Sequence, residues 1–175
     1  MSNQVVDNQG NIWNTNVTSG YAQVINMMPV YIKKLKLDAK IPSHGSADAA
    51  GYDLYACLED EVEGIYIEPH ETKLIGTGLA FAIPDGTFLG IYARSGLASK
   101  KGLRPANCVG IIDSDYRGEV MIAIHNDTQN KQYIENGERI AQGILQHYMP
   151  MDFKEVNSLP DTDRGLNGFG STGSK

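Results

Sequence analysis

The sequence predicts an all-β domain, and two observations support this prediction. Short apolar runs recur from Val30 onward, and turn-forming residues separate them. Short strands divided by turns at intervals of roughly ten residues are typical of a β-sandwich or β-barrel. The 175 residues are 41% hydrophobic and 21% charged, which is ordinary for one globular domain with a sizeable core.

The apolar runs and the turn signals between them predict the strands and one helix in chain order. Turn signals lie at Pro69-His70, at "PDG" 84–86, at 113–118 and at "NG" 136–137, and only "GLASKKG" at 96–102 is a predicted helix. Residues 1–28 are rich in Asn, Gln, Ser and Thr without a sustained period, so we predict an extension outside the core. The predicted strands are residues 30–37, 51–56, 64–69, 72–83, 87–93, 119–126, 131–135 and 139–149.

Charge and hydropathy exclude several classes of function. A net charge of −6 argues against a broad nucleic-acid footprint, although a few local arginines could still bind a small anion. No run approaches the ~18 apolar residues of a membrane helix, and no secretory signal is visible. Cys57 and Cys108 lack a CxxC spacing, so we expect buried free thiols, no membrane association and an intracellular, cytoplasmic location.

Residues 107–126 have the pattern of a β-hairpin. Two strand-like segments, "NCVGIID" and "EVMIAIHN", flank turn residues at 114–118. Asp113 and Asp115 lie at the predicted bend, where a rigidly held carboxylate suits catalysis. The alternative is that both are Asx-turn residues that only stabilise the bend.

Two further segments carry polar groups next to predicted strands. Arg94, Ser95 and Gly96 combine a guanidinium, a hydroxyl and free N–H groups, which together could bind phosphate; the alternative is a Ser N-cap beside a solvated Arg. Gln142 interrupts an apolar strand and needs a partner, unless it faces outward. His125 and His147 have no spaced metal-ligating partner and are predicted to be structural.

The C-terminal stretch "DRGLNGFGSTGSK" is too glycine-rich for helix or strand. It places Phe169 and Arg164 among glycines and hydroxyls, which are the groups needed to hold a phosphorylated ligand with a ring. A frayed terminus is the simpler alternative.

Five motifs in this order resemble the trimeric dUTP pyrophosphatase (dUTPase) family, and the resemblance covers about residues 30–173. The motifs are "AAGYDLYA" at 49–56, "RSGLASK" at 94–100, "NCVGIIDSDYRGEV" at 107–120, "GERIAQGIL" at 137–145 and "RGLNGFGSTG" at 164–173. The resemblance implies a jelly-roll-like β domain over 29–162, an N-terminal extension at 1–28, and a mobile C-terminal arm at 163–175. It also implies a homotrimer in which that arm closes over a neighbouring subunit's site.

The resemblance further implies hydrolysis of dUTP to dUMP and pyrophosphate with Mg²⁺. Asp113 is then the general base, and Tyr116 packs on the deoxyribose and excludes a 2′-hydroxyl. Asp53 either supports Mg²⁺ through water or makes a structural contact to the second motif. The remaining expected substrate contacts are Asn107, Gly110, Ile111, Ile112 and Met121 at uracil, Arg94, Ser95, Gly96 and Gln142 at the phosphates, and Arg164, Phe169, Gly170, Ser171 and Thr172 from the arm.

Two alternative functions stay open at this point. A dCTP deaminase-like relative would share the fold, although the Asp113–Tyr116 pair suits hydrolysis of a uracil nucleotide better. A trimeric nucleotide-binding regulatory module would bind without turnover, and residues 1–28 could contact a protein partner.

Overall fold

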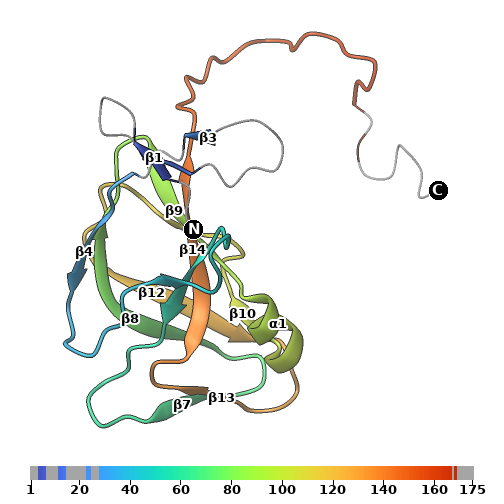
Figure 1. Ribbon diagram of the computed structural model, residues 1–175. Coiled ribbons are helices and arrows are strands. Elements are labelled where there is room, and N and C mark those ends of the chain that lie inside the picture. Colours follow the sequence, from blue (N-terminus) through green and yellow to red (C-terminus); the bar gives the residue numbers. More distant parts are fainter. Residues whose placement is uncertain (1–3, 7–11, 15–22, 25–27, 167, 169–175) are drawn as a thin grey trace.

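The computed structural model describes residues 4–6, 12–14, 23–24, 28–166 and 168 (Figure 1). Over these residues the regular structure is strand apart from one short helix, which confirms the all-β prediction. The elements are β1 (Gln4–Val6), β2 (Ile12–Asn14), β3 (Gln23–Val24), β4 (Tyr31–Lys34), β5 (Ser43–His44), β6 (Tyr52–Tyr55), β7 (Gly64–Ile67), β8 (Thr72–Ala82), β9 (Thr87–Tyr92), α1 (Ser95–Lys101), β10 (Leu103–Pro105), β11 (Gly110–Ile112), β12 (Glu119–Asn126), β13 (Gln132–Glu135) and β14 (Arg139–His147).

Two larger antiparallel sheets enclose most of the core, and the two-stranded sheet of β7 and β13 adds Ile67 and Ile134 to it. One has the strand order β10-β12-β8-β4, and the other has the order β11-β9-β14-β6-β5. On β12, Val120, Ile122 and Ile124 are buried, whereas Met121 between them is exposed, as expected for a strand with one face on the core. A single hydrophobic cluster takes side chains from both sheets, and each fully buried Ile or Leu contributes roughly 1.5–3 kcal/mol.

Each predicted strand contains an observed one, and the predicted helix is α1. The sequence pattern missed β5 and β10 because both are too short to show alternation. β10 also includes Pro105, which is tolerated because this strand lies at the edge of its sheet.

The prediction of a β-hairpin over 107–126 is wrong. β11 pairs with β9 in the five-stranded sheet, whereas β12 pairs with β8 and β10 in the four-stranded sheet. The segment 113–118 therefore crosses from one sheet to the other. Turn chemistry is the same for a hairpin and for such a crossover, so the local sequence did not distinguish them.

The N-terminal extension contains regular structure that its composition did not predict. β1, β2 and β3 form an antiparallel three-stranded sheet. Among the described residues this sheet has no ladder to the sheets around the core.

Both cysteines are free thiols, as predicted, but only Cys57 is buried. Burial, with a hydrogen bond to Asp38, raises the pKa of Cys57 to about 11. Cys108 is exposed, which corrects the expectation for that residue, because it lies in the bend between β10 and β11.

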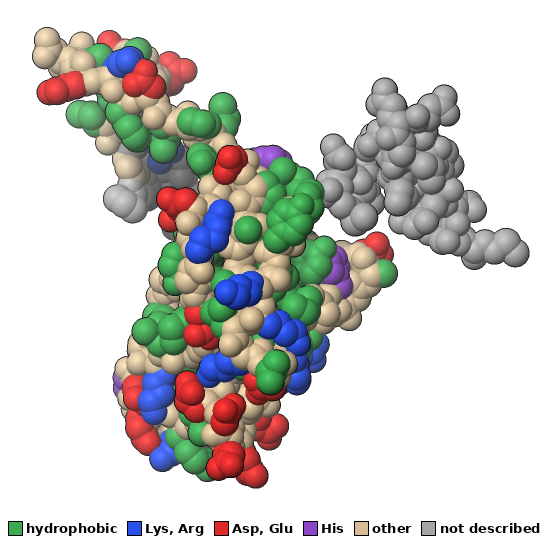
Figure 2. Space-filling view, turned by 90° about the vertical axis from the view of Figure 1, so that its left-hand side faces the viewer, with side chains coloured by type: hydrophobic (Ala, Val, Ile, Leu, Met, Phe, Trp, Pro, Cys, Tyr) green, Lys and Arg blue, Asp and Glu red, His purple; other side chains and the backbone are tan. Residues whose placement is uncertain are grey.

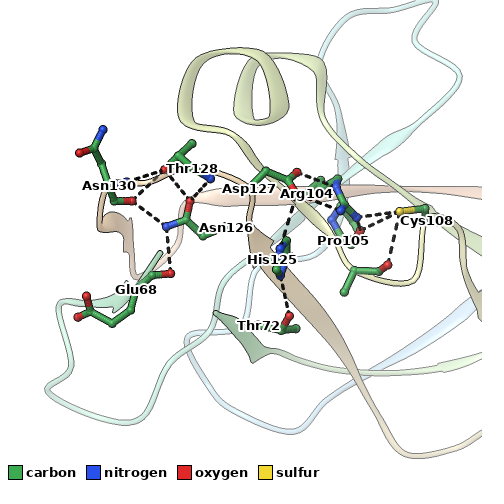
Figure 3. A network of polar contacts seen from close by, with 11 residues as sticks. Glu68, Thr72, Arg104, Pro105, Cys108, His125, Asn126, Asp127, Thr128 and Asn130 are labelled. Atoms are coloured by element: carbon green, nitrogen blue, oxygen red, sulfur yellow. Dashed lines mark hydrogen bonds and ion pairs between the residues drawn. The ribbon is translucent and has the colours of Figure 1, made fainter. Parts of the chain in front are cut away.

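Buried Asn126 links two connections at one end of the four-stranded sheet, the one after β7 and the one after β12 (Figure 3). Its Nδ2 donates to the carbonyls of Ile67, Glu68 and Asn130, and its Oδ1 accepts from the backbone N–H and the hydroxyl of Thr128. Every buried side-chain N or O atom in the described part of the chain has such a partner.

The last strand ends at His147, and residues 148–166 contain neither helix nor strand. This segment leaves the body of the molecule, and hydrophobic side chains are visible on it between charged ones (Figures 1 and 2). Its large apolar side chains are mostly exposed: Tyr148, Met149, Met151, Phe153, Val156, Leu159 and Leu166. We found no helix in the described residues with the length and hydropathy needed to cross a bilayer.

Candidate active site

Three predicted motifs meet in one polar pocket of about 180 Å³. The pocket lies where β6, the end of β9, the start of α1 and the start of β14 come together. Its lining is Gly45, Ala49, Gly51, Asp53, Arg94, Ser95, Gly96, Arg139 and Gln142. The structure thus brings together the predicted phosphate-binding residues of the second and fourth motifs, with Asp53 of the first beside them.

Asp53 is the anionic centre of this pocket. Its side chain is only 8% exposed, and each carboxylate oxygen accepts from a different guanidinium. Arg94 Nε donates to Oδ1 at 2.6 Å, and Arg139 Nη1 donates to Oδ2 at 3.1 Å. The contact between the first and second motifs is therefore present.

The local chain geometry aims Arg94 at Asp53. Arg94 is the N-cap of α1 with an extended backbone, and Gly102 ends the helix in the left-handed conformation. Ser95 is the first helical residue, and its carbonyl accepts from the Ser99 hydroxyl. The alternative of a Ser95 cap beside a solvated Arg94 is therefore wrong.

Gln142 lies on the outer face of β14, as one alternative expected, but it also has specific partners. Its Nε2 donates to the Ala93 carbonyl at 2.9 Å. A Cβ at Gly51 would lie 2.6 Å from Gln142 Oε1 and 3.2 Å from Gln142 Cβ, so the two residues are in close contact. Gln142 thus connects the first motif to the end of β9.

Asp113 lines a second pocket of about 480 Å³, together with Thr87, Phe88, Ile111, Ser114, Asp115 and Tyr148. Asp113 itself is exposed, and its carbonyl accepts from the Tyr116 N–H in a tight turn. The Tyr116 hydroxyl donates to the Glu119 carbonyl, and Arg117 caps carbonyls within the same turn. The turn is therefore well ordered around an accessible carboxylate.

The bend that carries Asn107 is held by a polar network (Figure 3). Arg104 donates from Nε and Nη2 to the two oxygens of Asp127 and from Nη1 to Cys108 Sγ at 2.9 Å. These bonds lower the pKa of Asp127 and raise that of Arg104. A Cβ at Gly110 would lie 3.1 Å from Asn107 Nδ2, so Asn107 packs over the start of β11.

The structure does not gather all predicted residues in one place. Met121 lies in the four-stranded sheet opposite Gly76, whereas Ile111 and Ile112 lie in the five-stranded sheet. Arg164 lies in the turn 163–166. Phe169, Gly170, Ser171 and Thr172 lie outside the described residues.

The two pockets lie at opposite ends of β9. Phe88 lines the pocket of Asp113, whereas Arg94 follows Tyr92 at the other end of the strand. At about 3.3 Å per residue, Phe88 and Tyr92 are separated by about 13 Å. One chain therefore does not place Asp113 and Arg94 on the same phosphate group.

Sequence reasoning missed Arg139, the second cation of the pocket. The signal was present in "GERIAQGIL", where an arginine precedes Gln142 in the fourth motif. Simple alternation would place Arg139 and Gln142 on opposite faces of a strand, so the pattern gave no reason to combine them.

The described residues offer no direct site for a metal ion. They contain no group of three or more His, Cys, Asp or Glu side chains that could hold one. Both oxygens of Asp53 are already bonded to guanidinium groups. These residues alone therefore do not fit a protein-bound divalent cation.

The fold and the pockets define a β domain with a cationic pocket at one end of strand β9. The chain belongs to the dUTPase family, whose family model matches residues 38–173. A deoxyuridine 5'-triphosphate nucleotidohydrolase of Nautilia profundicola is 45% identical over 146 residues, which are 83% of this chain and 99% of that protein. The enzyme of the same name from Acinetobacter baylyi is 46% identical over 144 residues, covering 82% and 94%.

A solved structure agrees with this assignment. The chain is similar to the dUTPase of Staphylococcus bacteriophage 80alpha with dUpNHpp, with a TM-score of 0.74 and 29% identity. The similarity covers 84% of this chain and 99% of the phage protein. The fold is thus shared over nearly the whole phage protein.

Proposed function

We propose that this protein hydrolyses dUTP to dUMP and pyrophosphate. The observation that carries the proposal is the pocket around Asp53, Arg94 and Gln142, which joins three of the five family motifs. Its relatives are named for this reaction, and the phage dUTPase was solved with dUpNHpp. The reaction would lower the dUTP level and so limit uracil incorporation into DNA, and it would also supply dUMP.

In the proposed mechanism, Asp113 orients a water molecule and accepts its proton as that water attacks the α-phosphate. An accessible carboxylate in a rigid turn suits this task, and a positioned base adds typically ~10²–10⁴-fold to the rate. Tyr116 packs against the deoxyribose. Asn107 and the backbone near Gly110 read the uracil edge, with the other predicted contacts at Ile111, Ile112 and Met121.

Arg94, Ser95, Gly96 and Gln142 hold the phosphate chain in this proposal. Displacement at phosphorus depends mainly on positioning and charge stabilisation, which preorganised guanidinium groups supply. Mg²⁺ would be held by phosphate oxygens and water, since it keeps several water ligands and the described residues offer it no direct ligand set. Arg164, Phe169, Gly170, Ser171 and Thr172 would complete the site from the arm, as the resemblance implies.

We further propose a jelly-roll-like homotrimer with shared sites. The separation of Asp113 from Arg94 supports sharing, because the α-phosphate must lie near both groups. The outer face of the five-stranded sheet joins the two pockets and is suited to contact between copies. It presents Phe88, Ile111 and Ile144, and the Tyr92 hydroxyl bonds Gln146 at 2.6 Å over Gly90.

The projecting segment also supports association. Met149, Met151, Phe153 and Leu159 are exposed on a segment without secondary structure, and such side chains gain stability by packing against a partner. Light scattering is expected to give a mass three times that of the 19.1 kDa chain. A catalytically active monomer would contradict shared sites.

The activity is tested by measuring pyrophosphate release from dUTP, dTTP, UTP and dCTP, with and without Mg²⁺. We expect release from dUTP alone among the four, and only with the metal. Hydrogen-bonding sites of this kind can discriminate between bases by ~10⁴–10⁵-fold. Formation of dUTP or dUMP from dCTP would instead indicate a deaminase, and binding without turnover would indicate a regulatory module.

A further inference from the structure

Arg139 is the group in the Asp53 pocket to which the proposed mechanism gives no role. We propose that Arg139 is a second phosphate-binding guanidinium, which contacts the triphosphate chain of the substrate beside Arg94. The inference rests on the proposed function and adds one residue to the groups that bind the substrate's phosphates.

A β-bulge aims Arg139 into the pocket. On β14, Arg139 pairs with Tyr55 and Ala141 pairs with Leu54, so Ile140 is an additional residue in the ladder. Ile140 and Ala141 are consequently both buried, while Arg139 and Gln142 both line the pocket. Bulges of this kind re-aim side chains next to active sites, and without this one Arg139 would face away from Gln142.

The remaining donors of the two arginines are available to a ligand. Hydrogen bonds between described residues use two of the five N–H donors of Arg94, to Asp53 and to the Arg139 carbonyl. They use one of the five on Arg139, whose side chain is 48% exposed at the rim of the pocket. Each guanidinium can therefore offer further N–H groups to phosphate oxygens, with which its planar fork forms bidentate bonds.

The charge of the cluster favours a polyphosphate. Asp53 carries one negative charge and the two guanidinium groups carry two positive charges, so the cluster is net positive in a chain of net charge −6. The shared carboxylate also holds the two cations side by side, which reduces the cost of ordering them when a ligand binds.

The test follows from the number of phosphates that can reach the pocket. Arg139 lies beside Arg94, on the other oxygen of the same Asp53 carboxylate. A triphosphate offers these two guanidinium groups more oxygens than a monophosphate does. Arg139 should therefore affect binding of a triphosphate more strongly than binding of a monophosphate.

The test compares the affinities for dUpNHpp and dUMP by isothermal titration calorimetry. For Arg139→Gln we expect the Kd of dUpNHpp to rise roughly 10- to 100-fold, as for loss of charge-assisted hydrogen bonds, and the Kd of dUMP to rise by a clearly smaller factor. Arg139→Lys should recover part of the loss, because the charge returns without the fork.

Lys131→Gln is the matched control, since Lys131 is also 48% exposed and also pairs with a carboxylate, that of Glu68. Its affinities should equal those of the unaltered protein. Unchanged dUpNHpp binding by Arg139→Gln would overturn the inference, and so would an equal loss for both nucleotides. If the unaltered protein neither hydrolyses dUTP nor binds dUpNHpp, the proposed function itself fails, which is a different result.

Discussion

At the residue scale, the role proposed for Asp113 requires an accessible carboxylate, and the turn at 113–116 leaves it exposed. The backbone of Asp113 bonds Tyr116, whereas its side chain faces the pocket of Phe88 and Ile111. Among the described hydrogen bonds and ion pairs none uses the Asp113 carboxylate, so it has no structural task there that competes with catalysis.

Asp113→Asn is expected to bind dUpNHpp with unchanged affinity and to lose dUTP turnover by ~10²-fold or more, because an amide cannot accept the proton of the attacking water. Steady-state pyrophosphate release and calorimetry measure the two quantities. Turnover within a few-fold of the unaltered protein would show that another group is the base.

Ionisation of the Cys57 thiol is expected to lower the free energy of unfolding at alkaline pH. Its pKa is raised from 9.0 to about 11, so the folded state keeps the proton longer than the unfolded state. The stabilisation is complete below pH 9 and is lost as the pH rises toward 11. Between pH 8 and 10.5 the loss is about 2 kcal/mol, from 1.36 kcal/mol per pKa unit.

Urea unfolding at these two pH values measures this loss. Cys57→Ala should lose about 2 kcal/mol less than the unaltered protein, because the titrating group is gone while every other group remains. Equal losses in the two proteins would show that ionisation of the Cys57 thiol does not cause the loss of stability at alkaline pH.

At the element scale, β8 depends on one glycine in its middle. Gly78 has φ of +66°, and a Cβ there would lie 2.8 Å from both Ala39 Cβ and Cys57 Sγ. Its N–H donates to Glu119 Oε1, and its carbonyl accepts from Leu35. The strand thus bends at Gly78 while it keeps contact with β12 and β4.

Gly78→Ala is expected to lower the free energy of unfolding by about 2–5 kcal/mol, from left-handed strain of about 1–2 kcal/mol and overpacking of about 1–3 kcal/mol. Gly86→Ala is the matched control, because Gly86 has φ of +75° but no described atom within 4 Å of its Cβ position. It should cost only the strain. Equal losses in thermal or urea unfolding would exclude the clash at Gly78.

The sequence identified most elements because their alternation or turn signals are local. It failed where the outcome depends on distant partners. The turn at 113–118 has the same residues whether it closes a hairpin or crosses between sheets, and the choice depends on β11 joining β9 and β12 joining β8.

The same limit explains which site residues were found. Arg94, Ser95, Gly96 and Gln142 could be combined because their motifs are specific, and the structure brings them into one pocket. Arg139 was missed because the bulge at Ile140 reverses its face, and such a bulge has no marker in "GERIAQ". The bond of Asp53 to both arginines was likewise visible only once β6 and β14 were paired.

At the scale of the whole molecule, one chain carries two separate pockets, which the proposed function assigns to one shared site. Asp113 belongs to one end of β9 and the arginine pocket belongs to the other. On the face drawn in Figure 2, acidic and basic side chains are interspersed, so charge does not mark that face as a nucleic-acid surface. In the proposed trimer, assembly completes the site, and this can be tested without knowing the interface in detail.

Two inactive variants should restore each other if sites are shared. Asp113→Asn supplies intact arginine pockets, and Arg94→Gln supplies intact Asp113. The two variants are unfolded together in equal amounts and reassembled. In a cyclic trimer, the chain that supplies Asp113 to a site and the chain that supplies Arg94 are then chosen independently, each intact with a probability of about one half. About a quarter of the unaltered dUTPase activity should therefore return. As a control, mixing Asp113→Asn with Asp113→Asn/Arg94→Gln should restore none. If mixed assemblies form, as shown by native mass spectrometry of differently tagged chains, and activity stays at the level of the separate variants, then each chain must complete its own site.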